Sequence, residues 1–160
     1  MRRLTIDNSQ KTFATGIGFV LAAILLTMTS CDKNRVEPYS DIPEIRLEEV
    51  SHSTIKQYED ILQIRIFYQD GNGDIGFESP EEYALFVRDI RLEEFDGFYI
   101  GPITPPGVAV PIQGYLDIEF PVLFLFGNGD AENTRFQIKL IDRAGNESNL
   151  LETATITIVR

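Results

Sequence analysis

The sequence has a single cysteine, a single histidine and few basic residues. Because Cys31 lies near the N-terminus, the remainder of the chain has no thiol for a disulfide or for a Cys/His zinc site. The histidine, His52, stands between two serines with no acidic pattern nearby, and we expect a solvated loop residue. Phosphate-binding glycine loops and a nucleophile-elbow motif are also missing. These absences favour a non-enzymatic protein.

Basic residues are outnumbered, with 14 Lys and Arg against 25 Asp and Glu and a formal net charge of −11 at pH 7. Residues 1–30 hold three basic residues and one acidic residue, so without them the charge becomes −13. Such a surface repels phosphate backbones, which excludes nucleic acid as a partner. Acidity suits divalent cations or basic partner surfaces, and it also serves solubility.

The longest apolar run, residues 13–28, follows Arg2, Arg3 and Lys11 and leads into the segment TSC that ends at Cys31. A basic start, a short apolar stretch and small residues before a break are typical of an export signal. The segment LTMTSC resembles the lipobox of bacterial lipoproteins, which implies diacylation of Cys31 as the first mature residue. An ordinary secretory signal and a spanning anchor are the alternatives, although the run is shorter than the ~20 residues that span a bilayer.

This interpretation divides the chain into a signal peptide (1–30), a lipidated tether (31–43) and one domain (44–160). The tether is polar and contains Pro38 and Pro43. The length of the remainder suits one hydrophobic core.

The domain is predicted to be all-β, because short apolar and alternating runs recur between turn signals and helical periodicity is nearly absent. Seven to eight such strands predict an immunoglobulin-like antiparallel β-sandwich, with a small barrel as the alternative. The expected strands are 44–50, 61–69, 83–92, 97–100, 115–120, 122–126, 134–141 and 153–159. The run 122–126 has no polar alternation and is expected to be a buried strand, or else an edge that docks on a partner. Between 101 and 114, four prolines and three glycines predict a surface loop.

An acidic loop, DGNGDIG, directly follows the strand 61–69. Oxygen-bearing side chains at Asp70, Asn72 and Asp74, separated by glycines, are the kind of ligand set that Ca²⁺ takes. The EF-hand pattern fails because Ile75 stands where a glycine is required. Calcium binding and plain turn formation both remain open, since Asp-Gly and Asn-Gly pairs are strong turn formers.

A second acidic loop, DRAGNESN, begins at Asp142 after the strand 134–141. In an immunoglobulin sandwich the loops after the second and sixth strands emerge at the same pole. We therefore expect Asp142 to lie near Asp70 and Asp74, either as a further calcium ligand or as a turn cap. A third acid-rich corner, residues 127–133, is expected at the opposite pole as a hairpin turn.

The succession of a lipobox, FYQDGNGDIG and IDRAGNESN resembles a group of small lipoproteins from Bacteroidota, which show related D-G-D-G-D and D-R-A-G-N segments in this order. The resemblance implies a β-sandwich lipoprotein of the outer membrane, on its periplasmic or its cell-surface face. The expected function is that of an accessory subunit held by its lipid to the bilayer and docked on an outer-membrane protein. The alternative is a free-standing module that binds glycan or protein, with calcium stiffening the pole of loops.

Overall fold

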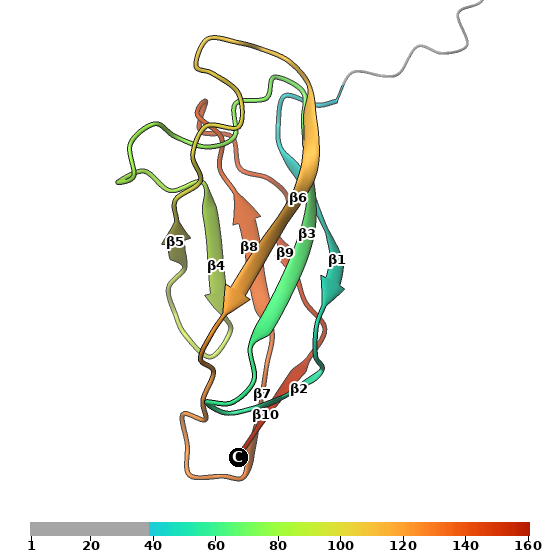
Figure 1. Ribbon diagram of the computed structural model, residues 1–160, viewed down its shortest axis with the longest axis vertical. Coiled ribbons are helices and arrows are strands. Elements are labelled where there is room, and N and C mark those ends of the chain that lie inside the picture. Colours follow the sequence, from blue (N-terminus) through green and yellow to red (C-terminus); the bar gives the residue numbers. More distant parts are fainter. Residues whose placement is uncertain (1–38) are drawn as a thin grey trace, which may run out of the picture. The chain divides into compact units, whose positions relative to one another are not determined.

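The computed structural model describes residues 39–160, and the predicted signal peptide, Cys31 and most of the predicted tether lie outside the described residues (Figure 1). The described part is all-β and contains no helix. Within it, no helix of the length and apolar character required to cross a membrane occurs.

One layer of the domain is a three-stranded antiparallel sheet in the order β1-β3-β6. Its strands are β1 (Glu44–Val50), β3 (Leu62–Asp70) and β6 (Ile112–Phe120). The register pairs Leu62 with Phe120 and Asp70 with Ile112, so β3 and β6 are in contact over their full length. Asp70 is the last residue of β3, the central strand of this layer.

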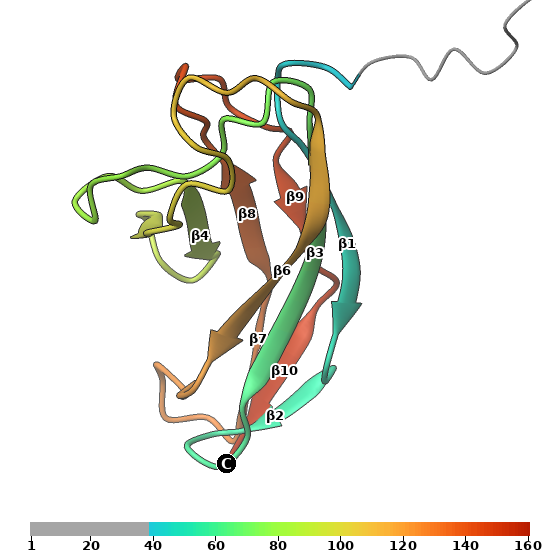
Figure 2. The same cartoon turned by 45° about the horizontal axis from the view of Figure 1, so that its top comes forward.

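The second layer contains a four-stranded sheet, β5-β4-β8-β9, and a small sheet, β2-β10-β7. Only Arg135 separates β7 from β8, so the small sheet continues the larger one (Figure 2). The pairs are antiparallel apart from β2 with β10. The strands are β2 (Thr54–Lys56), β4 (Leu85–Asp89), β5 (Asp96–Phe98), β7 (Ala131–Thr134), β8 (Phe136–Leu140), β9 (Leu151–Glu152) and β10 (Ile156–Val159).

This strand order is that of an immunoglobulin-like sandwich. β1, β3 and β6 take the places of strands A, B and E, while β5, β4 and β8 take those of C′, C and F. The predicted fold is thus confirmed, but the strand count of seven to eight was wrong and the structure has ten. The expected strand 134–141 is interrupted at Arg135, and the expected strand 153–159 begins only at Ile156. The short β2 and β9 carry too few residues for a periodic signal.

The segment 122–126 corrects a second expectation, because it is neither a strand nor wholly buried. Leu123 is buried, while Val122, Phe124 and Phe126 are exposed. Pro121 ends β6 just before it, since proline donates no hydrogen bond to a ladder. The corner at residues 127–133 lies at the predicted pole, but it passes into β7 at Ala131.

The core lies between the layers and follows strand periodicity. Along β3, Leu62, Ile64 and Ile66 are fully buried, and Gln63 and Arg65 are exposed, as the alternation predicts. Residues 136, 138 and 140 of β8 face them from the second layer. The rings of Phe120 and Phe136 meet across the layers with centroids 4.4 Å apart.

A side-chain clip fastens β1 to the β9 side of the sandwich. The Ile45 N–H donates to Asn149 Oδ1, and Asn149 Nδ2 donates to the Ile45 carbonyl, both at 2.9 Å. Asn149 thereby satisfies both backbone groups of a residue on an edge strand. Asn149, the last residue of DRAGNESN, therefore has a structural role, because it joins β1 to the opposite layer of the sandwich.

We expect Asn149→Ala to lower the free energy of unfolding by about 1–3 kcal/mol, because two partly buried backbone groups lose their partners. Urea unfolding measures this loss, and hydrogen exchange should show faster exchange of the Ile45 amide. The exposed Asn128→Ala is the matched control and should leave both measurements unchanged. An Asn149→Ala protein as stable as the parent would contradict the role of the clip.

Candidate metal centre

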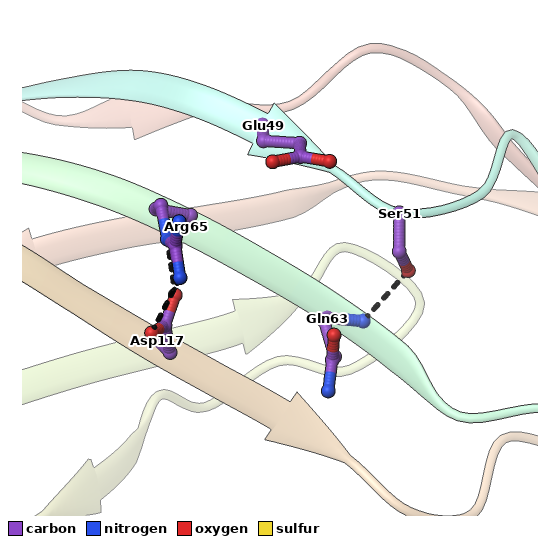
Figure 3. A pocket seen from close by; sticks show the side chains of 5 residues that line it. All are labelled: Glu49, Ser51, Gln63, Arg65 and Asp117. Carbon is purple, nitrogen blue, oxygen red and sulfur yellow. Dashed lines mark hydrogen bonds and ion pairs between the residues drawn. The ribbon is translucent and has the colours of Figure 1, made fainter.

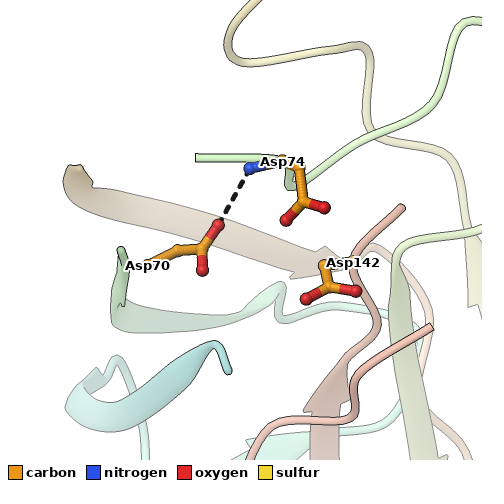
Figure 4. Close-up of side chains that lie close together, drawn as sticks. All are labelled: Asp70, Asp74 and Asp142. Atoms are coloured by element: carbon orange, nitrogen blue, oxygen red, sulfur yellow. Dashed lines mark hydrogen bonds between the residues drawn. The ribbon is translucent and has the colours of Figure 1, made fainter. Parts of the chain in front are cut away.

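Three aspartates from two loops meet at the pole where β3 and β8 end (Figure 4). Asp70 is the last residue of β3, Asp74 follows in the next loop, and Asp142 begins the loop after β8. One carboxylate oxygen from each aspartate lies within 4.8 Å of those from the other two. The structure therefore brings together the two acidic loops that the sequence predicts at one pole.

Strand periodicity explains why two of these acids are buried. Asp70 continues the inward series of β3 that includes Ile66 and Tyr68, and its side chain is 0% exposed. Asp142 continues the inward series of β8, two residues after the buried Leu140, and is 1% exposed. Since alternate residues of a strand share a face, both carboxylates are carried to the end of the core.

The loop after β3 folds tightly around the first aspartate. The Asp74 N–H donates to Asp70 Oδ2 at 2.9 Å and contacts Asn72 Oδ1 at 3.3 Å. Gly73 has a φ of +71°, and a Cβ there would lie 2.3 Å from the Val110 carbonyl oxygen. The second glycine of DGNGD is thus required both by its backbone conformation and by space.

The loop after β8 is organised by Asp142 itself. Asp142 Oδ1 accepts the Asn146 N–H at 2.8 Å, and Asp142 Oδ2 accepts the Asn146 side-chain amide at 2.9 Å. Gly145, with a φ of +84°, allows the chain to turn between them. The Arg143 N–H donates to the Asp74 carbonyl at 3.1 Å, which ties this loop to the first one.

Turn formation accounts for some of the carboxylate oxygens and leaves two unexplained. Asp70 Oδ1 and Asp74 Oδ1 are buried and have no hydrogen-bond partner. In Figure 4 the three carboxyl groups lie in a common space between the loops. A buried charged oxygen without a partner is strongly destabilising, and a bound cation is one way to satisfy it. This feature separates the triad from an ordinary pair of capped turns.

Burial has the largest effect on the electrostatics of the site. Burial first, and then the neighbouring charges of Asp74 and Asp142, raise the pKa of Asp70 to about 6 against the opposing hydrogen bond from the Asp74 N–H. The pKa of Asp74 is also raised, first by burial and then by Asp142, while Arg143 acts in the opposite direction. Repulsion among like charges in a desolvated space is the condition that a cation relieves.

Arg143 is close to the triad but is engaged elsewhere. Its Nη1 donates to the Gly76 carbonyl at 3.0 Å, and Nη2 lies 3.4 Å from Thr104 Oγ1. Among the ion pairs of the described residues, none joins Arg143 to a triad carboxylate. The arginine therefore reduces the negative charge at the site from a distance without occupying the carboxylate oxygens.

Asn72, the fourth predicted ligand, is placed differently from the aspartates. Its Oδ1 serves the turn at Asp74, and the residue borders a shallow cavity of about 280 Å³ beside Gly107 and Arg143. The triad by itself consists of Asp70, Asp74 and Asp142.

The proline-rich loop of residues 99–111 covers the site, a contribution that sequence reasoning missed. Thr104 is buried, and its hydroxyl donates to the Gly73 carbonyl. The Val110 N–H donates to the Asn72 carbonyl at 3.2 Å. Sequence reasoning placed this segment on the surface as a connection. Nothing in its composition signals the contact with the DGNGD loop.

A second hollow, on the outer face of the β1-β3-β6 sheet, lacks the features of a binding site (Figure 3). It has about 80 Å³ and is lined by Glu49, Ser51, Gln63, Arg65 and Asp117. Arg65, the basic side chain in this lining, is already paired, because it donates to both carboxylate oxygens of Asp117 at 2.6 and 3.0 Å. Exposed pairs of this kind contribute at most ~1 kcal/mol to stability.

No protein-family model matches this chain, and no match to it occurs among the curated proteins or the solved structures. The resemblance to Bacteroidota lipoproteins stays a prediction from the sequence. The function has to be argued from the geometry of the site.

In calcium-free buffer we expect the unfolding free energy to rise by about 1 kcal/mol when the pH falls from 7.5 to 5.0. The folded pKa of Asp70, about 6, exceeds the ordinary value of 3.8, so the folded state takes up the proton first and gains stability. Asp70→Asn should weaken this dependence, leaving the part that arises from the raised pKa of Asp74, and should stabilise the metal-free domain at pH 7.5. Urea unfolding at the two pH values measures both effects.

The control is Asp130→Asn, the same substitution at a side chain that is 97% exposed at the opposite pole. That variant should keep the pH dependence of the parent. An Asp70→Asn protein with the parent's pH dependence would show that the effect arises elsewhere.

Proposed function

We propose that this chain is a non-enzymatic, lipid-anchored binding module of the outer membrane, whose loop pole is stiffened by a calcium ion held by Asp70, Asp74 and Asp142. The observation that carries the metal assignment is the fully buried carboxylate of Asp70, whose Oδ1 has no partner and faces two further carboxylates. The membrane attachment rests on the sequence of residues 13–31.

The chemistry of the donors selects the kind of cation. All three ligands are carboxylates, which suits a hard ion, whereas zinc sites are built mainly from cysteine and histidine. Ligands on opposite sides of one Ca²⁺ are up to about 5 Å apart, so a cluster spanning 4.8 Å fits. Three carboxylates supply three to six of the ~6–8 oxygens that Ca²⁺ takes, and carbonyls or water would complete the shell.

Calcium would act here as a cross-link between loops. Asp70 ends β3 and Asp74 lies in the β3–β4 loop that follows it, while Asp142 belongs to the β8–β9 loop. The loops at one end of a sandwich are where such folds commonly carry their binding residues. An ion shared by both loops would neutralise the repulsion among the acids and hold the pole in one conformation.

Two forms of this function differ in what the module binds, and one observation favours the accessory subunit over the free-standing module. At the end of the sandwich away from the triad, Tyr58, Phe124 and Phe126 expose 66%, 41% and 47% of their surface. Tyr58 stacks on Phe124, and Phe124 contacts Phe126, so the exposed rings are contiguous. A contiguous apolar surface is typical of a protein-binding site. Copurification from solubilised membranes should therefore yield a stoichiometric protein partner.

At a calcium concentration 100-fold above Kd, we expect the folded state to gain ~2.7 kcal/mol. This gain corresponds to a rise in Tm of roughly 8 °C for a domain of this size. Asp70→Ala/Asp74→Ala and Asp142→Asn should each abolish the rise, while Asn72→Ala should retain most of it. Asp130→Asn, at the opposite pole with a side chain that is 97% exposed, is the matched control. A parent protein whose Tm is unaffected by calcium would remove the metal from the proposal.

Replacing Cys31 by serine should release the protein from the membrane fraction, because acylation requires the thiol. We expect the parent protein to incorporate a clickable palmitate analogue and to sediment with outer membranes, whereas Cys31→Ser does neither. Mass spectrometry should find an acylated Cys31 as the first residue of the parent. An unprocessed N-terminus or an unmodified Cys31 would refute the anchor while leaving the calcium test unaffected.

A further inference from the structure

The exposed rings of Phe124 and Phe126 line a cavity at the side of the sandwich, between the β4–β5 hairpin and the segment after β6. The cavity has about 210 Å³. Ligand pockets usually run to ~300–1,000 Å³, so this one has room for a single large side chain. We call the exposed apolar residues at and beside its mouth the aromatic patch: Tyr58, Leu92, Phe98, Val122, Phe124 and Phe126.

The backbone conformation of Tyr58 and its contacts with Leu123 and Phe124 hold one side of the aromatic patch in place. Tyr58 has a φ of +65°, and it is the one residue other than glycine with a positive φ in the described chain. Its N–H donates to the Leu123 carbonyl at 3.1 Å, and its ring lies parallel to that of Phe124 with centroids 6.0 Å apart. A large residue seldom adopts this conformation, and such residues cluster at functional sites.

Arg91 fixes the other side of the aromatic patch. Its guanidinium lies 4.0 Å from the ring centroid of Phe126 and donates to the Phe124 carbonyl at 3.0 Å. Asp89 and Glu132 hold the same guanidinium through ion pairs of 2.6 and 2.9 Å. The rings are therefore preorganised before any partner arrives, which reduces the entropy lost on binding.

The charge around the aromatic patch is mainly acidic, and Lys56, two residues before Tyr58, is paired with Glu59. Asp96 lines the cavity, and the exposed Glu93 and Glu94 stand on the same hairpin. Arg91, the one basic residue that lines the cavity within residues 39–160, is neutralised by its two acidic partners. An anionic membrane surface would be repelled by this rim, whereas a basic protein surface would be attracted to it.

We propose that the aromatic patch docks a segment of a partner protein that inserts one apolar side chain into the cavity and surrounds it with lysine or arginine residues. The inference rests on the accessory-subunit role and names the chemistry of the partner. Apolar anchors in a preformed pocket with a charged rim are the usual arrangement of an interaction hot spot.

The aromatic patch and the metal centre lie at opposite ends of β3. Leu62 pairs with Phe120 beside the cavity, and Asp70 is at the other end, about 26 Å away at the rise of an extended strand. The two sites can therefore be changed separately, and each can fail without the other.

Position-specific photocrosslinking of the full-length protein in its native cells tests the proposal. Benzoylphenylalanine placed at Phe124 or Val122 should crosslink one protein at least 10-fold more than at Tyr115 or Leu150, which are similarly exposed elsewhere. Mass spectrometry should locate the crosslink on an apolar residue with Lys or Arg within about four positions. Yields at the level of the controls, a lipid adduct, a second copy of this chain, or a segment without basic residues would each overturn it.

Two variants examine the contributions of charge and shape. Asp96→Lys should reduce the crosslink at Phe124 at least 10-fold, whereas Asp41→Lys, an equal change of charge at an exposed distant position, should not. Tyr58→Gly should reduce the crosslink without lowering Tm, because glycine adopts a positive φ freely. Equal crosslinking by Asp96→Lys and the parent would refute the basic partner.

The calcium-dependent rise in Tm is the folding control for every patch variant. A lost crosslink with a retained calcium response supports the docking site. Control-level crosslinking by a parent protein that still responds to calcium refutes only the docking site. Asp142→Asn should lose the calcium response and keep the crosslink, whereas a parent protein that crosslinks without any calcium response refutes only the metal.

Discussion

The candidate site depends on the two-residue period of its strands. Even-numbered residues of β3 and β8 face the core, and this series ends on Asp70 in β3 and continues past the end of β8 to Asp142. An alternation that buries isoleucine and leucine therefore also buries Asp70 and Asp142. Shifting either strand by one residue would turn the whole apolar face and its terminal carboxylate toward solvent. The stability of the core and the geometry of the acidic site are thus set by the same register.

Because one register sets both features, the packing that stabilises the core also buries a carboxylate that destabilises the folded state. Packing the apolar faces of the two layers stabilises the fold, while ionised Asp70 at the end of that face destabilises it by on the order of 1–3 kcal/mol at neutral pH. The hydrogen bond from the Asp74 N–H to Asp70 Oδ2 offsets part of the cost of burying this charge. Asp70 Oδ1 and Asp74 Oδ1 are buried and accept no hydrogen bond, so the rest of the desolvation cost falls on these two oxygens.

The fold and the meeting of the acidic loops were predictable from local pattern. The alternation in β3 and the assignment of β3 and β8 as the second and sixth strands were enough to place Asp142 near Asp70 and Asp74. The burial of these acids was also implied by the alternation, since it follows from extending each strand by two residues. The position of Asn72 was not, because a side chain that caps its own turn and one that binds an ion share the same sequence pattern.

Other features depend on contacts between distant segments and leave no local signal. The cover over the site by Thr104 and Val110 comes from a proline-rich loop whose composition excludes a strand but does not say what it contacts. The exposure of Phe124 is also invisible in the run VLFLF, which is typical of a buried strand. Phe124 is exposed because Pro121 ends the ladder, and in the segment that follows, Leu123 is buried and Leu125 packs partly against the core.

The chain enters the domain beside the acidic pole, where the Ser40 carbonyl accepts the Gly71 N–H at 2.7 Å. A Cβ on Gly71 would lie 2.1 Å from the Tyr39 carbonyl oxygen, so the entering segment rests directly on the residue that follows Asp70. Mechanical tension on the N-terminal segment would reach this contact first and then load β1 along its axis, where its ladder to β3 resists in shear. A pull on the chain would therefore displace the acidic loop before β1 separates from β3.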